Sequence, residues 1–391
     1  MTARRDAAVR DLLEDIEFLV RCESPSSDHE AVARSADAVA TLGHRLLATK
    51  PERLVVDGCT HLRWRFGGAP RVLLLGHHDT VWPEGTLEKH PYAVRDGVLR
   101  GPGCFDMKAG VVMALHAAAV AGTPAGLSIL ITGDEEIGSP TSRRLIEEEA
   151  RGCDAVFVLE ASADGGALKC RRKGVSLYRI DVDGRAAHAG LEPEKGVNAA
   201  VEIAHQILAV AALADAGRGT TVVPTALSAG TTTNTVPAHA GMAVDVRVWD
   251  EAEQQRVDDA LRGLRPVLTG SRIRISGGIN RPPLQATASS VLFDLAASRA
   301  AELGLGTLTA AAVGGASDGN FTAGLGIPTL DGLGAVGGGA HADDEHVIVA
   351  ELPRRTALLG ALIDAVLAKG TPCPTANAAD DHGASPRWPA R

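Results

Sequence analysis

Aromatic residues are scarce in this chain of 391 residues, where Phe, Trp and Tyr together make up 3%. The core must therefore be built mainly from Ala, Val and Leu. Lys and Arg number 39 against 48 Asp and Glu, which gives a formal net charge of -9. Nucleic acids and anionic membranes bind basic surfaces, so this balance argues against both as partners. No apolar run reaches the roughly 20 residues of a membrane span.

Paired cysteine motifs are also missing. The six cysteines are scattered without a CxxC pair, and a chain of this length does not need a disulfide framework. We therefore expect free thiols in a reducing compartment. The amino terminus lacks the uninterrupted apolar stretch of a signal peptide, because acidic residues from Asp11 to Glu17 interrupt it. These features predict a cytoplasmic protein.

What the chain does contain is an alternation of strand-like and helix-like segments. The apolar runs 72–75, 126–132 and 156–159 are typical of strands buried on both faces of a parallel sheet. A buried helix is predicted over 109–121. From Gly174 apolar and polar residues alternate, as in half-buried antiparallel strands. The predicted fold class is α/β, a mostly parallel sheet flanked by helices, with an inserted smaller α+β domain.

The length favours two domains, because 391 residues exceed what one hydrophobic core usually fills. After a Pro-Pro pair, the alternation of helices and strands that precedes Gly174 resumes. We therefore expect a discontinuous catalytic domain made of residues 1–173 and 285–369. The insertion would span residues 174–284. Residues 370–391 are rich in Pro, Ala, Asp and Gly without apolar periodicity, which predicts a disordered tail.

Potential metal ligands stand at predicted strand ends or in loops: His77, Asp106, Glu136, Glu160 and His341. Open α/β sheets place their ligand sites at the carboxyl ends of strands. Two neighbouring divalent cations need a carboxylate that bridges them, and Asp106, in a glycine-rich loop, is the predicted bridge. His77 and Glu160 would complete one site, and the remaining two ligands the other. This donor set predicts two zinc ions, with cobalt and manganese as alternatives.

Two further acids lie beside these ligands. Asp79 follows His77 by two residues, so on an extended segment both side chains point the same way. Asp79 is therefore expected to accept the imidazole N–H and to fix the tautomer that binds metal. Glu135 precedes Glu136 and is the predicted general base, which takes a proton from water and later gives it to the leaving amine. Together these residues predict a two-metal hydrolase.

The motifs around these residues resemble the di-zinc exopeptidase and deacylase family, which includes glutamate carboxypeptidase, acetylornithine deacetylase, succinyl-diaminopimelate desuccinylase and aminoacylase. The matching segments are 76–80, 103–110, 133–138, 159–160 and 339–341. They follow the family's order and approximate spacing. A single histidine at a strand end is more often structural, and an acidic pair is usually solvated, but five motifs in order favour the ligand assignment.

The same resemblance implies roles for the insertion, which is similar to the family's lid and dimerisation domain. It implies a homodimer through the lid, domain closure, and His188 as the group that stabilises the tetrahedral oxyanion, in some dimeric members from the partner subunit. Asn234 and Arg247 resemble residues that hold the substrate carboxylate. Arg281 resembles a further substrate-binding arginine of the glutamate carboxypeptidase branch.

The branch of the family follows from a few positions. Glu160 favours the carboxypeptidase and deacylase branches, since aminopeptidase branches tend to place Asp there. The glutamate carboxypeptidase branch is the most similar, although its lysine for the substrate side chain does not align cleanly, and Lys169 or Arg172 would substitute. The family also implies a cis peptide before Met107. The predicted substrate is an N-acyl or peptidyl amino acid, glutamate-like first, with an N-acyl amino acid deacylase and a non-catalytic binding protein as alternatives.

Overall fold

Short, continuous apolar segments form the central sheet of the structure, a computed structural model that describes residues 2–368. Its strands hydrogen-bond in the order β1 (Glu52–Val56), β2 (Cys59–Phe66), β6 (Leu127–Thr132), β3 (Val72–His77), β7 (Ala155–Val158) and β14 (Thr329–Leu330). From β6 to β14 the strands are parallel, whereas β1 and β2 are antiparallel to their neighbours. Every residue of β3, β6 and β7 is buried. The predicted mostly parallel sheet is confirmed.

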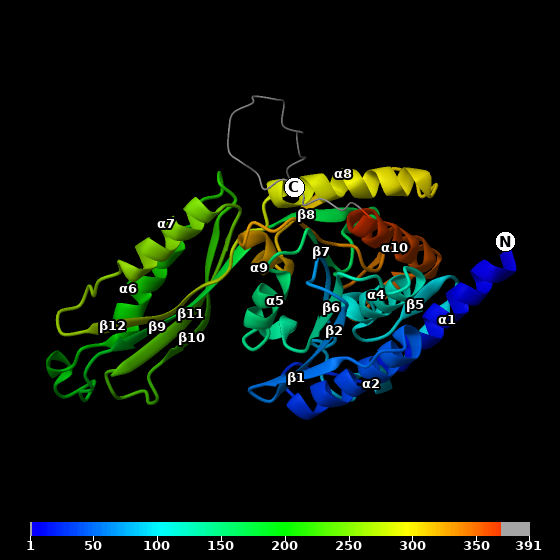
Figure 1. The fold of residues 1–391 in the computed structure, drawn as a ribbon. Coiled ribbons are helices and arrows are strands. Elements are labelled where there is room, and N and C mark those ends of the chain that lie inside the picture. The colour runs from blue at the N-terminus through cyan, green and yellow to red at the C-terminus, as the bar shows by residue number, and fades with distance from the viewer. Residues whose placement is uncertain (1, 369–391) are drawn as a thin grey trace, which may run out of the picture.

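Helices cover both faces of this sheet (Figure 1). One face packs through Leu74 and Ile129 into a core shared by α1 (Thr2–Val20), α2 (His29–Leu47), α4 (Ala109–Val120), α8 (Ala286–Glu302) and α10 (Leu352–Ala368). The other face packs through Leu73 and Leu75 against α5 (Arg143–Ala150) and α9 (Gly319–Gly324). Successive strand residues point to opposite faces, so burial on both sides explains why β3 is apolar throughout.

Small sheets hold the loops at the edge of this core. β4 (Ala93–Arg95) and β5 (Val98–Arg100) follow the short helix α3 (Thr86–Lys89) and continue through β16 (His346–Ile348) to β15 (Gly337–Gly338). β8 (Leu168–Arg172) pairs in parallel with β13 (Ala310–Val313). These pairings bring the segment around residue 341 beside the hairpin near residue 100, although the two are far apart in sequence.

A separate antiparallel sheet lies between β8 and α8 in the chain. It has the order β10 (Thr221–Ala229), β11 (His239–Val248), β9 (Gly174–Asp183) and β12 (Arg272–Arg281), with α6 (Ala199–Ala211) and α7 (Glu251–Arg262) packed on it. Alternate residues of β9, among them Tyr178, Ile180 and Val182, form a core with both helices. Figure 1 shows this layer beside the larger α/β part. β12 continues to residue 281 and so reaches the end of this antiparallel sheet nearest α8 in the chain.

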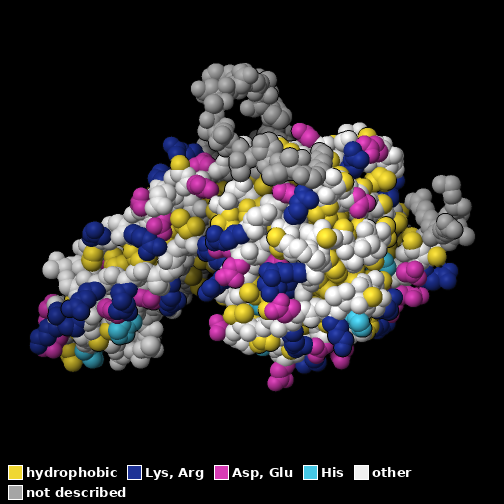
Figure 2. All heavy atoms as spheres, in the orientation of Figure 1, with side chains coloured by type: hydrophobic (Ala, Val, Ile, Leu, Met, Phe, Trp, Pro, Cys, Tyr) yellow, Lys and Arg dark blue, Asp and Glu magenta, His cyan; other side chains and the backbone are white. Residues whose placement is uncertain are grey.

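Surface and terminal features complete the description. Figure 2 shows side chains of both charge signs over the visible face of both parts. Within residues 2–368 no helix is long and apolar enough to cross a lipid bilayer. Free thiols occur at Cys22, Cys59, Cys104, Cys153 and Cys170. The predicted tail, 370–391, lies outside the described residues, as does the sixth cysteine.

Candidate metal centre

The carboxyl ends of three parallel strands bring acids and a histidine to one edge of the central sheet. His77 is the last residue of β3, Glu136 lies in the short helical turn after β6, and Glu160 follows β7 by two residues. Neighbouring parallel strands end at the same edge, which is why these side chains meet. His341 comes from the loop between β15 and β16 and has a φ of 62°, which is uncommon for a residue other than glycine.

Asp106 stands between the two histidines. Its Oδ1 lies 3.3 Å from Nε2 of His77, and its Oδ2 lies 3.3 Å from Nε2 of His341. Nε2 of His77 is also 3.5 Å from a Glu160 oxygen, and Nε2 of His341 is 3.1 Å from a Glu136 oxygen. Each oxygen of Asp106 therefore faces a different histidine and carboxylate pair, as a carboxylate that bridges two cations must.

Tight backbone packing presents Asp106. Gly103 has a φ of 70°, and a Cβ at this position would collide with the side chain of Thr80. A Cβ on Gly110 would collide with the carbonyl of Leu159. The peptide between Asp106 and Met107 is cis, as the family resemblance implied. These contacts explain why the loop around Asp106 is rich in glycine.

The cluster strongly favours positive charge. Burial opposes protonation of His77, but the nearby carboxylates of Asp106, Asp79 and Glu160 outweigh it and raise the pKa of His77 well above its usual value. Hydrogen bonds with Asp106 and a neighbouring glutamate raise the pKa of His341 to about 10. Nε2 of His77 is buried, and no hydrogen bond satisfies it among residues 2–368. Zinc ions are bound in proteins by histidine nitrogens and carboxylate oxygens, and here a buried histidine nitrogen faces carboxylates. The residues therefore fit such a metal.

The ligand atoms also group in a second way. His77, Asp106 and Glu136 offer atoms within 4.8 Å of one another, and so do His77, Glu135 and Glu160. The second group includes Glu135, the predicted base, in place of Asp106. We favour Asp106 as the carboxylate shared by the two ligand groups, because one of its oxygens faces His77 and the other faces His341.

Asp79 orients both His77 and the loop after β6. Nδ1 of His77 lies 3.0 Å from the backbone oxygen of Asp79 and 3.4 Å from its carboxylate. The same carboxylate accepts the backbone N–H groups of Glu135 and Glu136, each at 3.2 Å, and the hydroxyl of Ser26 at 2.6 Å. Sequence reasoning placed Asp79 beside His77 but missed the amide contacts, because they join residues more than fifty positions apart.

Glu135 lies in a buried ionic cluster. Its side chain is 11% exposed, and Oε1 accepts a hydrogen bond from Nη2 of Arg281 at 3.0 Å. The same nitrogen donates to Asp318 at 2.9 Å and to Ser139 at 2.7 Å. Burial raises the pKa of the Glu135 carboxyl well above its usual value, and the charge of Arg281 opposes this rise. Sequence reasoning assigned Arg281 to the substrate and gave no role to Asp318 or Ser139.

Two cations of β8 lie on the Glu160 side of the cluster. Arg172 is buried, donates from Nε to Asp331 at 2.7 Å, and places Nη2 3.6 Å from a Glu160 oxygen. Burial and the charge of Arg172 lower the pKa of Lys169, whereas Glu160 opposes that shift. Positive charge therefore flanks this side of the cluster.

The remaining predicted site residues, His188, Asn234 and Arg247, lie in the insertion. No hydrogen bond or ion pair in the part of the chain that the structure describes joins them to the metal-ligand cluster. His188 and Asn234 are neighbours, since the N–H of Ala189 donates to the Asn234 carbonyl at 2.9 Å. Arg247 donates twice to Asp245, at 2.8 and 3.0 Å. The structure thus brings the five predicted ligands together with Glu135, the predicted base, and its partners. It does not bring His188, Asn234 or Arg247 to this cluster.

Comparisons with known proteins agree with this geometry. The family model described as peptidase family M20/M25/M40 matches residues 73–365. Carboxypeptidase G2 from Pseudomonas sp. is 31% identical over 373 residues, which cover 90% of this chain and 88% of that protein. A succinyl-diaminopimelate desuccinylase from Methylobacterium radiotolerans is 30% identical, with coverages of 92% and 97%.

Solved structures show the same fold. The M20 family metallo-carboxypeptidase Sso-CP2 from Sulfolobus solfataricus matches with a TM-score of 0.70 at 16% identity, covering 91% of this chain and 98% of that one. A dinuclear metal-binding peptidase of the M20 family from Bacillus subtilis matches with a TM-score of 0.63 at 15% identity, with coverages of 93% and 99%.

Proposed function

This chain belongs to peptidase family M20/M25/M40 and is a metal-dependent amide hydrolase, and on that premise we propose that it releases a C-terminal amino acid, glutamate-like first, from an N-acyl or peptidyl substrate. The observation that carries the proposal is the position of Asp106 between two histidines, with Glu135 close by. The similarity to carboxypeptidase G2 supports a carboxypeptidase activity.

We propose that two divalent cations, zinc first and cobalt or manganese as alternatives, bind at this cluster. His77 and Glu160 would hold one ion, Glu136 and His341 the other, and Asp106 would bridge them. When bound, the ions supply Lewis acidity, which acidifies water and polarises the scissile carbonyl. The buried, unsatisfied nitrogen of His77 and the acidic surroundings support this assignment.

Glu135 would serve as the general base. It would take a proton from the attacking water and pass it to the leaving amine. Burial raises the pKa of the Glu135 carboxyl well above its usual value, and the charge of Arg281 opposes this rise by favouring the ionised form that a base requires. Asp79, which binds the amide of Glu135, would hold the base in place.

Substrate binding would involve both parts of the molecule. Residues 174–284 would act as a lid on a catalytic domain formed by residues 1–173 and 285–369. His188 would stabilise the oxyanion, and Asn234 and Arg247 would bind the substrate carboxylate. Because no hydrogen bond or ion pair among residues 2–368 joins these three to the ligand cluster, they would reach it through lid closure or from a partner subunit.

Arg281 would bind a substrate carboxylate as well. Its Nη2 donates to Glu135, whereas the hydrogen bond of Nη1 within residues 2–368 is a long one, at 3.5 Å, to Asn280. Lys169 and Arg172 would meet an acidic side chain of the substrate from the Glu160 side. Guanidinium groups bind carboxylates through charge-assisted hydrogen bonds, so this arrangement favours an acidic amino acid.

We further propose a homodimer that forms through the lid, and a cytoplasmic location. The free thiols of the described residues support a reducing compartment. Light scattering would test the dimer, and a monomer would require His188 to act within its own chain.

An N-acyl amino acid deacylase is the second candidate. The desuccinylase relative is as similar in sequence as carboxypeptidase G2, within one percentage point of identity. The two activities differ in which side of the amide is recognised. A binding protein without activity is disfavoured, because Glu135 stands beside a complete ligand set.

Release of free amino acids from a panel of N-acyl and peptidyl amino acids would test the function, with zinc supplied and a chelator as control. We expect chelator-sensitive release that is fastest from acidic C-terminal residues. Selectivity for the acyl group, with tolerance of the amino acid, would favour the deacylase. No release from any member by zinc-loaded protein would contradict both.

A further inference from the structure

Glu345 is buried behind the loop that carries Asp106, with 3% of its surface exposed. Its Oε1 accepts the backbone N–H groups of Phe105 at 2.8 Å and Asp106 at 3.0 Å. Its Oε2 accepts the backbone N–H of Gly103 at 2.8 Å and the indole N–H of Trp82 at 2.7 Å. One carboxylate thus accepts four hydrogen bonds, and three of them come from the loop of a predicted metal ligand.

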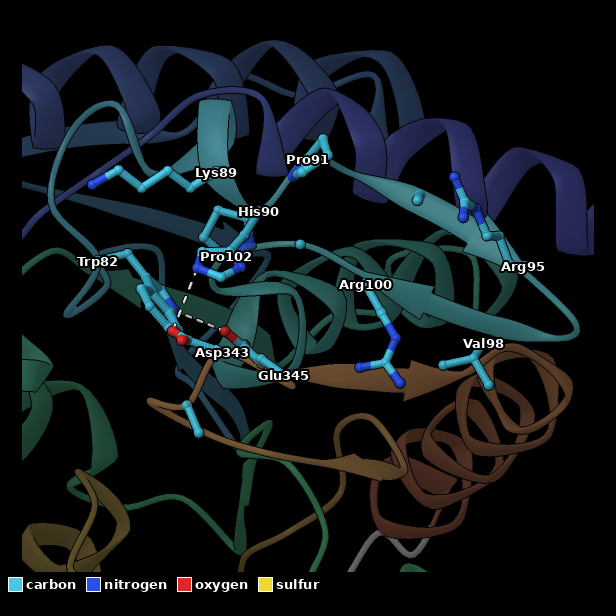
Figure 3. A pocket seen from close by; sticks show the side chains of 13 residues that line it. Trp82, Lys89, His90, Pro91, Arg95, Val98, Arg100, Pro102, Asp343 and Glu345 are labelled. Carbon is cyan, nitrogen blue, oxygen red and sulfur yellow. Dashed lines mark hydrogen bonds and ion pairs between the residues drawn. The ribbon is translucent and has the colours of Figure 1, made fainter.

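Figure 3 shows the contact between Trp82 and Glu345 in the wall of a surface pocket of about 340 Å³. Trp82 lies in the loop that follows His77, and Glu345 follows His341 by four residues. The carboxylate therefore joins three segments that each carry a predicted metal ligand. No other carboxylate in the described part of the chain, 2–368, accepts hydrogen bonds from three backbone amides of the Asp106 loop.

The physical need for a carboxylate here follows from the donors. Backbone N–H groups that are buried without an acceptor destabilise a fold. An ionised carboxylate offers acceptor sites on both oxygens and no donor, so it can satisfy all four N–H groups. A glutamine of the same shape offers one oxygen and turns an NH₂ group toward the other N–H groups. The loop would then lose hydrogen bonds on one side.

We propose that Glu345 is a positioning residue for the metal centre. By binding the amides from Gly103 to Asp106, it holds the Asp106 carboxylate where one oxygen faces His77 and the other faces His341. Its contact with Trp82 fixes the His77 loop to the same point. The inference rests on the proposed metal site but not on the proposed substrate.

Zinc binding to the full chain tests this role, measured as affinity and stoichiometry by competition with a chromophoric chelator. Residues that orient metal ligands typically change metal affinity or activity by about 10–100-fold when replaced. We expect Glu345→Gln to weaken zinc binding within that range, with a changed visible absorption spectrum of the cobalt-loaded protein. That spectrum reports ligand geometry, which a role limited to stability would leave unchanged.

Asp343→Asn is the matched control. Asp343 lies on the same loop, its side chain is 83% exposed, and it forms an ion pair with His90 at 3.4 Å. We expect wild-type zinc affinity from this variant. Trp82→Phe removes one hydrogen bond of Glu345 and none of the Asp106 loop, so its effect on zinc affinity should be smaller than that of Glu345→Gln.

Folded Glu345→Gln with zinc affinity within about threefold of wild type, below the range for residues that orient metal ligands, would overturn the proposal. If that variant does not fold, Glu345→Asp decides, because it keeps the charge but is one methylene shorter and cannot reach all four donors. Wild-type zinc affinity and cobalt spectrum in Glu345→Asp would then overturn it. Zinc binding needs no substrate, so an error in the proposed substrate would not alter this result.

Discussion

Nη2 of Arg281 lies 3.0 Å from the carboxylate of Glu135, and the same nitrogen binds Asp318 at 2.9 Å. Two buried carboxylates thus share one guanidinium. The positive charge favours the ionised form of each acid, whereas burial favours the protonated form. Arg281 therefore influences both the orientation and the ionisation of Glu135.

Removal of Arg281 should shift the pH profile of the reaction. Arg281→Met removes a charge that lowers the pKa of Glu135, so that pKa should rise. The acidic limb of kcat/KM should move to higher pH, and activity should be lost first in acid. Arg144→Met, at an exposed position, is the control. A raised KM with an unmoved acidic limb would instead assign Arg281 to the substrate alone.

Replacement of the base should separate chemistry from metal binding. We expect Glu135→Gln and Glu135→Ala to lower kcat by about 10²–10⁴-fold, the usual contribution of a general base. Zinc stoichiometry should not change, as measured by metal analysis of the purified variants. Loss of one zinc ion would show that Glu135 is a ligand, as its proximity to His77 and Glu160 would allow. A normal rate would refute the base assignment.

His188→Ala should lower kcat by about 10²–10³-fold, the usual effect of losing an oxyanion donor. Zinc affinity should be unchanged, since within the described residues no hydrogen bond or ion pair joins His188 to the ligand cluster. If His188 acts across a homodimer, a mixture with Glu135→Gln should regain activity, because each mixed dimer holds one intact site. No recovery after verified subunit exchange would place His188 in its own chain.

Stability of the insertion should fall in acid through Glu253. Its side chain is inaccessible to solvent, and Arg256, Arg218 and Thr220 bind it. The hydrogen bond with Arg256 is the main cause that lowers the pKa of Glu253 to about 2 from an ordinary value of 4.5. A lowered folded-state pKa means that this stabilisation is complete above pH 4.5 and is lost as the pH falls toward 2.

Thermal unfolding at several pH values would measure this effect. Glu253→Gln should destabilise the protein by about 1–3 kcal/mol at neutral pH, because buried donors lose an acceptor. The acid-dependent loss between pH 4.5 and 2 should become smaller. Glu251→Gln, in the exposed first turn of the same helix, is the control. An unchanged acid dependence in Glu253→Gln would contradict the assignment.

The sequence predicted the central strands and their polar ends well, because a strand buried on both faces must be apolar throughout. β3, β6 and β7 lie within one or two residues of the predicted runs. The helix over 109–121 was also predicted correctly, because it too is largely buried and apolar. The β4–β5 hairpin was missed, since its strands have three residues each and carry no clear periodicity.

Side chains that bind distant backbone amides were also beyond sequence reasoning. Glu345 contacts residues about 240 positions earlier, and nothing in its neighbours marks that contact. Asp318 and Ser139 meet at Arg281 in the same way. Local patterns show which residues have suitable chemistry, whereas the fold alone shows which of them support the others.

β12 ends at Arg281, so the partner of Glu135 is the last residue of a strand that belongs to the inserted sheet. The insertion is therefore not structurally independent of Glu135. A chimaera that exchanged residues 174–284 for the matching segment of a relative would also exchange the neighbour of the base. Grafts that keep Arg281 from the parent chain should preserve that pairing, and the choice of junction on either side of this residue becomes a design variable.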